Sequence, residues 1–202
     1  MNKLEVLQIE YQYKMMIPPF EMDEYSKLTK QQAQEYFDWF TTQIPERIEI
    51  LLGAIESSGE KNLEQFDMTP ESLKPLWSWL KKNIKTTPKS QAEMNELKRT
   101  LPNWIFEDVN DWKLDSSTLV LAMDVSLYFA EVFLKNYSNL YWNILSKPKS
   151  HVDLNKPVII GFKNAPLYPP RIIRNSCSCY AEGDSSKNLL SLYEVWRNFI
   201  KI

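Results

Sequence analysis

The clearest pattern in the chain is an apolar stripe at helical spacing that begins after Thr29. Thr29 and Gln32 form a capping-box pattern, in which each side chain can satisfy a backbone N–H at the start of a helix. Pro45 lies inside the stripe and has no N–H to donate, so the helix should kink there or restart with Pro45 in its first turn. We therefore expect helical structure from Lys30, with an apolar face made of Ala33, Tyr36, Phe37, Phe40, Ile44, Ile48, Leu51, Leu52 and Ile55.

Three further segments have a helical period. The residues from Asp67 to Glu71 supply a cap, a first-turn proline and a first-turn acid for a helix that reaches Leu80, with Trp79 off its apolar stripe. Ser116 or Ser117 should cap the most clearly patterned helix, from about Thr118 to Asn136, which is apolar on several sides and therefore expected at the centre of the core. Residues 187–202 predict a closing amphipathic helix.

Strand patterns are shorter and lie mainly near the C-terminus. Residues 140–145 and 157–162 are rich in β-branched and aromatic side chains and should pair antiparallel. Residues 3–14 show a near alternation that favours a strand, and 171–180 favour a further one. Helices followed by strands predict a helix-rich α+β fold, with residues 1–202 as a single globular domain and a small antiparallel sheet from the C-terminal third.

The segment between residues 86 and 117 is polar, is interrupted by Pro88 and Pro102, and favours a long irregular connection with one helical turn around 92–99. Aromatic and acidic side chains alternate within it. Aromatic residues are favoured both in cores and as anchors of interfaces, and carboxylates steer basic partners. We therefore predict a partner-binding surface made of Trp104, Phe106, Glu107, Asp108, Asp111 and Trp112.

Composition narrows the class of function. The 202 residues carry a net charge of −2 and a pI near 5.6, which argues against nucleic acid as the partner. The N-terminal residues lack the uninterrupted apolar run of a signal peptide, and the longest apolar stretches are far shorter than a membrane span. The lone pair Cys177 and Cys179, predicted to lie in a strand, suits a reducing compartment, so a cytoplasmic location is expected.

The sequence shows no pattern for a cofactor or metal. The 4 glycines are scattered, so they form no phosphate-binding loop. His151 is the single histidine and lies in a polar connection, which rules out a site with several histidine ligands. We therefore predict neither a bound cofactor nor a metal site, and the chain is more consistent with a binding protein than with an enzyme.

A catalytic alternative lies on the central helix. Asp124, Tyr128, Glu131 and Lys135 follow spacings of four, three and four residues, so they share one helical face. If that face lined a cleft, Asp124 and Glu131 could act as an acid and base in a hydrolase, or bind a small ligand, with Tyr128 between them. Otherwise it is a solvated face stabilised by a Glu131–Lys135 pair.

Residues 166–171, Pro-Leu-Tyr-Pro-Pro-Arg, fit the P-x-x-P-x-R pattern of polyproline ligands. A loop that ends the preceding strand explains the same prolines with fewer assumptions.

In size, acidity and lack of a catalytic motif, the chain resembles small cytoplasmic proteins of Gram-positive bacteria and is similar to the immunity proteins of toxin systems. That resemblance implies a non-enzymatic protein that occludes its partner. Together with the acidic and aromatic segment, it predicts a protein-binding module for a basic partner; a purely structural subunit with a large apolar interface is the remaining alternative.

Overall fold

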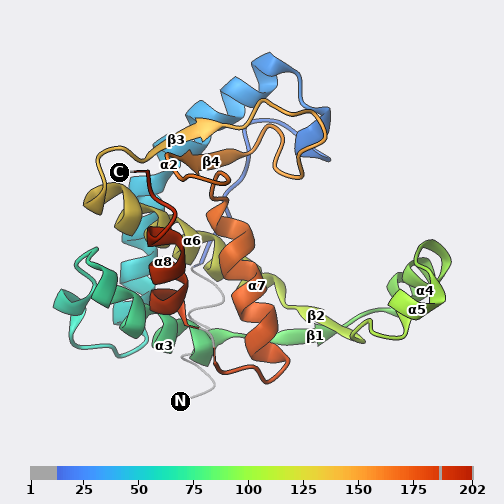
Figure 1. Ribbon diagram of the computed structural model, residues 1–202. Helices are drawn as coiled ribbons and strands as arrows, with labels where there is room; N and C mark the ends of the chain where they lie inside the picture. The colour runs from blue at the N-terminus through green and yellow to red at the C-terminus, as the bar shows by residue number, and fades with distance from the viewer. Residues whose placement is uncertain (1–12, 187, 202) are drawn as a thin grey trace.

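The computed structural model describes residues 13–186 and 188–201, and in these the chain forms a helix-rich α+β fold with two antiparallel sheets of two strands each (Figure 1). The fold class predicted from the sequence is confirmed. In chain order the elements are η1 (Tyr25–Lys27), α2 (Lys30–Ser57), η2 (Leu63–Gln65), η3 (Pro70–Ser72), α3 (Leu73–Asn83), β1 (Thr86–Pro88), α4 (Gln91–Thr100), α5 (Asn103–Phe106), β2 (Trp112–Leu114), α6 (Ser116–Asn136), β3 (Tyr141–Ile144), β4 (Pro157–Ile160), α7 (Pro169–Ala181) and α8 (Leu189–Arg197).

Helix α6 is the centre of the core, as its apolar circumference predicts. It packs against α2, α3 and α7, and Val125, Phe129 and Phe133 on it are fully buried. Its cap is Asp115, whose side chain accepts a hydrogen bond from the backbone N–H of Ser117, rather than either of the two expected serines. A carboxylate performs the same task because it accepts from the free N–H groups of the first turn.

By length and composition α6 is also apolar enough to cross a membrane, the one such helix among the described residues. Inside the fold, 67% of its most apolar window is buried. A core helix of this kind passes the same test, so its hydropathy assigns no location to the chain.

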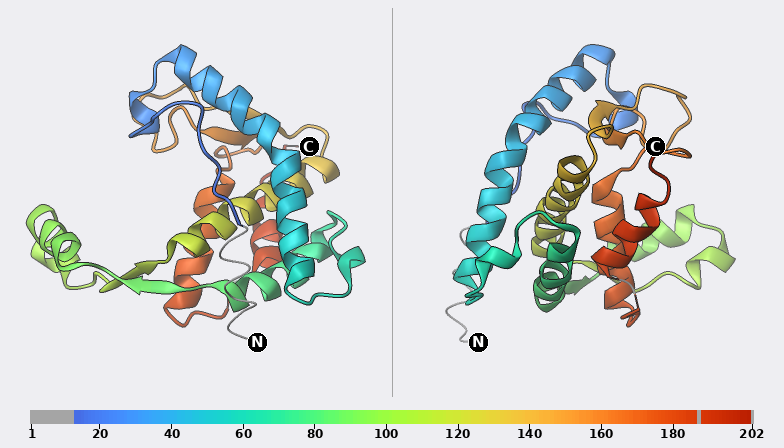
Figure 2. Two further views of the ribbon diagram at one scale, coloured as in Figure 1. Left: turned by 180° about the vertical axis from the view of Figure 1, so that it is seen from behind. Right: turned by 60° about the vertical axis from the view of Figure 1, so that its left-hand side comes forward.

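Helix α2 begins at Lys30 with the predicted capping box between Thr29 and Gln32. It runs through Pro45 as a single helix instead of restarting there. The helix bends along its length (Figure 2), in keeping with a proline that removes one hydrogen bond and crowds the preceding turn.

The smaller elements close the core. Pro70 begins the short η3, which leads directly into α3. Trp79 lies off the predicted stripe and is nevertheless buried. Its indole N–H is satisfied there, since it donates to Ser58 Oγ at 2.8 Å. The closing helix is α8, on which Tyr193 is 1% exposed. Trp79 shows that an aromatic residue outside the main stripe can still enter the core when its polar atom finds a partner.

Strands β3 and β4 pair antiparallel, as expected, with Tyr141 opposite Ile160. Gly161 ends the pairing with a φ of +114°, and a Cβ there would lie 2.6 Å from the carbonyl oxygen of Asn139. Glycine is therefore required at this turn. The strand predicted within residues 3–14 falls almost entirely outside the described part of the chain, and Tyr13 and Lys14 lie in no strand.

The strand expected at residues 171–180 is wrong, because this segment belongs to α7. Pro169 and Pro170 occupy the first turn of the helix, where a missing N–H leaves no hydrogen bond unmade. Ile173 and Cys177 are then buried at a spacing of four residues. Cys177 and Cys179 consequently lie on a helix rather than in a strand, and Cys177 is buried.

The connection expected to be irregular is an ordered arm, which we define as residues 86–114. Strands β1 and β2 form an antiparallel ribbon with Thr86 opposite Leu114, and α4 and α5 pack together at its far end. The ribbon projects from the body and holds the two helices away from it (Figures 1 and 2).

Candidate partner-binding site

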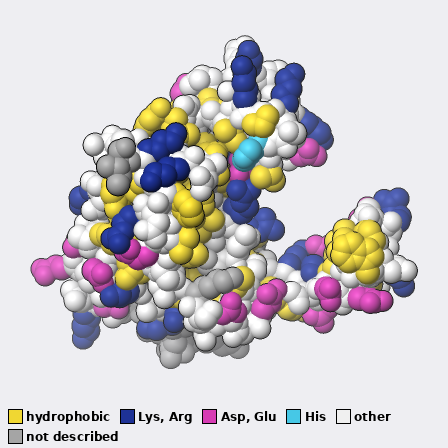
Figure 3. All heavy atoms as spheres, in the orientation of Figure 1, with side chains coloured by type: hydrophobic (Ala, Val, Ile, Leu, Met, Phe, Trp, Pro, Cys, Tyr) yellow, Lys and Arg dark blue, Asp and Glu magenta, His cyan; other side chains and the backbone are white. Residues whose placement is uncertain are grey.

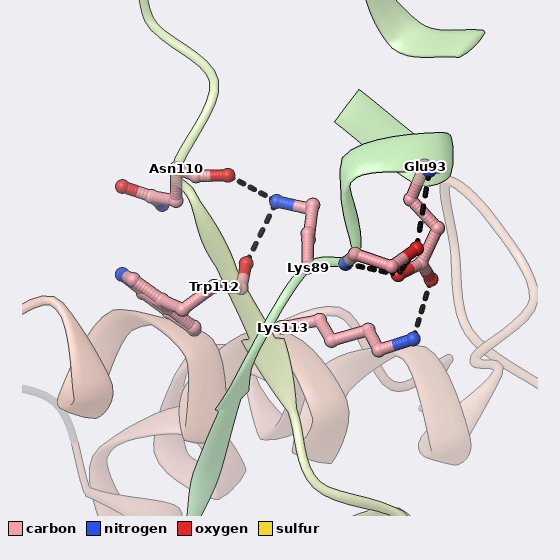
Figure 4. A network of polar contacts seen from close by, with 6 residues as sticks. Lys89, Glu93, Asn110, Trp112 and Lys113 are labelled. Carbon is pink, nitrogen blue, oxygen red and sulfur yellow. Dashed lines mark hydrogen bonds and ion pairs between the residues drawn. The ribbon is translucent and has the colours of Figure 1, made fainter. Parts of the chain in front are cut away.

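Lysine 89 closes the ribbon of the arm at its outer end. Its backbone N–H donates to the carbonyl of Asp111 at 2.7 Å. Its ammonium group donates to the carbonyl of Trp112 at 2.7 Å and also to that of Asn110 (Figure 4). One side chain thus satisfies carbonyls on the opposite strand just where the regular pairing stops.

Glu93 joins the first turn of α4 to the ribbon. Its carboxylate accepts from the backbone N–H of Ser90 at 2.7 Å and forms an ion pair with Lys113 of β2 (Figure 4). The hydrogen bond from Lys113 and those from Ser90 lower the pKa of Glu93 from 4.5 to about 2. This network sets the direction in which α4 leaves the ribbon.

The tip of the arm has almost no core of its own. Neither α4 nor α5 contains a buried residue, and Trp104 on α5 is 72% exposed. Hydrophobic side chains gather at the outer end of the arm, with acidic ones beside them along it (Figure 3). A large aromatic side chain that is left in water on an ordered element is a feature of binding surfaces.

The acidic residues of the arm fall into two groups. Glu93 is paired with Lys113, and Glu96 with Arg99. By contrast Glu107, Asp108 and Asp111 are exposed and have no ion pair within the described residues. The free carboxylates therefore belong to the segment that follows Trp104.

Four of the six residues predicted for this surface are exposed, and the other two, Phe106 and Trp112, are half-buried. Trp112 also packs against the main hydrophobic core, so it helps to anchor the arm. The exposed set is Trp104, Glu107, Asp108 and Asp111.

The residues of the catalytic alternative are not brought to one place. Asp124 is fully buried in a two-pronged ion pair with Arg47 of α2, with Arg47 Nε 2.9 Å from Oδ1 and Arg47 Nη2 2.5 Å from Oδ2. Tyr13 donates to the same carboxylate at 2.6 Å. Burial raises the pKa of Asp124, while the hydrogen bonds from Arg47 and Tyr13 oppose that shift. Three hydrogen bonds from the protein therefore already engage this carboxylate.

Tyr128 and Glu131 contact other parts of the fold than Asp124 does. Tyr128 is fully buried, donates to Ser72 Oγ at 2.8 Å and accepts from the backbone N–H of Met68. Glu131 accepts from the indole N–H of Trp142 at 3.3 Å, and burial raises its pKa. Lys135 donates to the carbonyl of Asp67. Asp124 and Glu131 line separate cavities, so the geometry gives no carboxylate pair facing one substrate.

The residues of the polyproline pattern, 166–171, are also engaged in contacts within the fold. Leu167 is fully buried and bridges to Ile159, while Pro169 and Pro170 start α7. Arg171 binds the buried Asp153 with both Nη atoms, at 3.0 and 2.6 Å. The prolines therefore serve a loop and a helix start. His151 lies in the polar connection and its Nδ1 accepts the backbone N–H of Asp153.

Two adjoining cavities lie between η1, α2, α6 and α7, and the sequence pattern does not predict them. The first has a volume of about 400 Å³ and is lined mainly by methionine, aromatic and aliphatic side chains, with Arg47 and Asp124 in its wall. The second, of about 610 Å³, lies against α6 and α7. A usable signal existed, since Arg47 interrupts an apolar stripe and so predicts a buried ionic partner.

In the part of the chain that the structure describes, no cluster of histidine, cysteine and carboxylate side chains could hold a metal ion. No protein-family model, curated protein or solved structure matches the chain.

Proposed function

We propose that this chain is a non-enzymatic protein-binding module of the immunity type, which uses the tip of its arm to occlude a basic protein partner. The observation that carries the proposal is Trp104, 72% exposed on an ordered helix that contains no buried residue. Burying an aromatic side chain of this size stabilises a complex substantially, and tryptophan is among the most enriched residues at binding hot spots.

Charge supplies the second argument. The exposed Glu107, Asp108 and Asp111 follow Trp104 in the chain and lack ion-pair partners within the described residues. Unpaired carboxylates around an apolar anchor attract a partner that presents basic residues around an apolar recess. Such charges act mainly on the rate of association and on the choice of partner.

The shape of the arm supplies the third. A ribbon that holds two short helices away from the body can reach into a recess of another protein, such as the active-site cleft of a toxin (Figure 1). The polar contacts of Lys89 and Glu93 fix the ribbon before binding, which reduces the ordering entropy that association would otherwise cost.

The test is photo-crosslinking in cells with a photoreactive phenylalanine at position 104, followed by affinity measurement with the captured protein. We expect Trp104→Ala to weaken the complex at least about 30-fold, equal to the ~2 kcal/mol of a hot spot. Glu107→Lys/Asp108→Lys should slow association, and the effect should shrink at high salt. A partner rich in lysine or arginine at the crosslinked site agrees with the proposal.

Tyr141→Ala is the matched control, because Tyr141 is an aromatic side chain that is 55% exposed on β3. It should leave the affinity unchanged. A captured protein that binds the Trp104→Ala variant as tightly as the wild type would refute the role of the arm tip.

A further inference from the structure

The two cavities beside α6 adjoin each other, and we refer to them together as the groove. Tyr25, Leu119 and Met123 line both of them. Their volumes, about 400 and 610 Å³, each fall in the range of small-molecule sites, roughly 300–1,000 Å³. Leu119, at their junction, is 40% exposed although it lies on the most apolar helix of the fold. The junction therefore presents aliphatic surface to any molecule that enters from either end.

One end of the groove is apolar and adaptable. Met15, Met16, Met22 and Met123 line the first cavity, which makes it the site of four of the 7 methionines in the chain. Trp39 and Leu119 add further apolar surface. Methionine side chains are unbranched and flexible, so they can adjust to an aliphatic chain of variable shape.

The ion pair in this cavity needs no hydrogen bond or charge from a ligand. Arg47 and Asp124 neutralise each other, and no buried side-chain polar atom in the described residues lacks a hydrogen-bond partner. An apolar guest can therefore lie beside the pair without leaving a polar group unsatisfied.

The other end of the groove is cationic. Lys156, Arg171 and Arg174 line the second cavity, and no acidic residue is among its lining side chains. Asp153, which is fully buried, binds both Lys156 and Arg171. Arg174 is exposed and has no ion pair within the described residues. Two of the three cations thus share one carboxylate and the third has none, which leaves an excess of positive charge.

Two of these cations, Arg171 and Arg174, lie on the face of α7 that lines the second cavity. Arg171, Arg174, Asn175 and Ser178 line the cavity at spacings of three, one and three residues, so they form one face of the helix. Leu119, Ala122 and Met123 form the facing wall on α6. The groove is therefore amphipathic across its width as well as along its length.

We propose that this groove binds a single-chain amphiphile, with its anionic headgroup at Arg171, Arg174 and Lys156 and its aliphatic chain among the methionines. A carboxylate or a phosphate ester could supply the headgroup, since both accept hydrogen bonds from guanidinium groups. The proposal is independent of the function assigned to the arm, because no residue of the arm lines either cavity.

The experiment is titration calorimetry of the full-length protein with octanoate, decanoate, decyl phosphate and decanol, each below its micellar concentration. Decanoate should bind more tightly than octanoate, by up to about fourfold for each added methylene, which corresponds to ~0.8 kcal/mol. Decanol should bind at least about tenfold more weakly than decanoate, since it cannot form charge-assisted hydrogen bonds. The tighter of decanoate and decyl phosphate identifies the headgroup, and either order agrees with the proposal.

Two variants locate the site. Arg174→Gln should weaken decanoate binding about tenfold, and Leu119→Asp should abolish it by placing a negative charge at the junction. Their matched controls are Lys61→Gln, an exposed cation in a loop, and Val195→Asp, a 53% exposed aliphatic residue on α8. Both controls should bind decanoate like the wild type.

Three results would overturn the proposal: no heat of binding with either anionic amphiphile, equal affinity for decanol and decanoate, or unchanged affinity in both Arg174→Gln and Leu119→Asp. If neither anion binds and Arg174→Gln instead weakens the complex with the captured protein partner, the groove belongs to the protein interface and not to a small-molecule site.

Discussion

Phe133 and Trp104 show how differently the body and the arm are built. Both are large aromatic residues on helices, but Phe133 is fully buried among the rings of Phe129, Phe162 and Tyr193, at centroid distances of 5.3, 5.6 and 4.4 Å. Trp104 is 72% exposed and makes no ring contact within the described residues. The body is stabilised by burial of apolar surface, whereas the arm is held by polar contacts on a short ribbon.

This contrast separates stability from recognition. A side chain that is buried on folding contributes its transfer free energy to the stability of the fold. A side chain that stays exposed makes such a contribution only when a partner buries it. Changes in the body should therefore alter the global free energy of unfolding, and changes in the arm should alter binding and local order.

The largest effect is expected at the buried ion pair between α2 and α6. Arg47→Met should destabilise the protein by about 3–5 kcal/mol, because it leaves the fully buried Asp124 without its cation. The double variant Arg47→Met/Asp124→Asn removes both charges and should recover at least half of that loss. Urea unfolding measures both free energies; a double variant no more stable than the single one would contradict this account.

The loss of stability in the single variant Arg47→Met should depend on pH. Burial already raises the pKa of Asp124, and Arg47 opposes that shift, so removal of Arg47 raises the pKa further. A carboxyl group with a raised pKa in the folded state is penalised only when ionised. The deficit of Arg47→Met should therefore shrink as the pH falls toward about 4, the usual pKa of the group.

A smaller effect on stability is expected when the outer arm is removed. Pro88 and Trp112 are opposite each other in the ribbon, so an Asn-Gly turn can replace residues 89–111 and close a two-residue hairpin. No residue in that range is buried. The free energy of unfolding should change by no more than about 2 kcal/mol, toward greater stability, because a shorter loop costs less entropy to close.

Thermal unfolding and a heteronuclear NMR spectrum of the shortened protein check this result. The amide signals of α6 and α7 should keep their positions. Loss of those signals would mean that the arm is part of the folding unit of the body, and the comparison between the two regions would fail.

The sequence predicted elements well where the signal was local. The capping box at Thr29 placed the start of α2 at Lys30, because the cap needs only residues that are neighbours in the chain. The same logic would have found α4, since Ser90 and Glu93 form a second capping box. The polar composition of that segment led instead to an irregular connection, because no apolar stripe was there to support a helix.

The candidate sites depended on long-range contacts that the sequence does not show. Trp104 is exposed, and its predicted role in partner binding stays a prediction. Asp124 and Glu131 share a helical face in sequence, but Arg47 lies 77 residues away in the chain and captures Asp124. Likewise the cationic wall of the groove depends on α7, whereas the sequence pattern favours a strand at residues 171–180.

The smallest expected effect is a change in the local stability of the arm, and it depends on pH. The pKa of Glu93 is lowered to about 2 by Lys113 and Ser90, so its contribution is fully present above about 4.5 and is lost as the pH falls through about 2. Glu93→Gln keeps a capping side chain but removes the ion pair with Lys113. Between pH 5 and 2, hydrogen-exchange protection of α4 should therefore decline in the wild type more than in Glu93→Gln, while protection of α6 stays equal in the two proteins. Glu96→Gln, which breaks only the pair with Arg99 inside α4, should follow the wild type; if it behaves like Glu93→Gln, the link between α4 and the ribbon is not what fixes the arm.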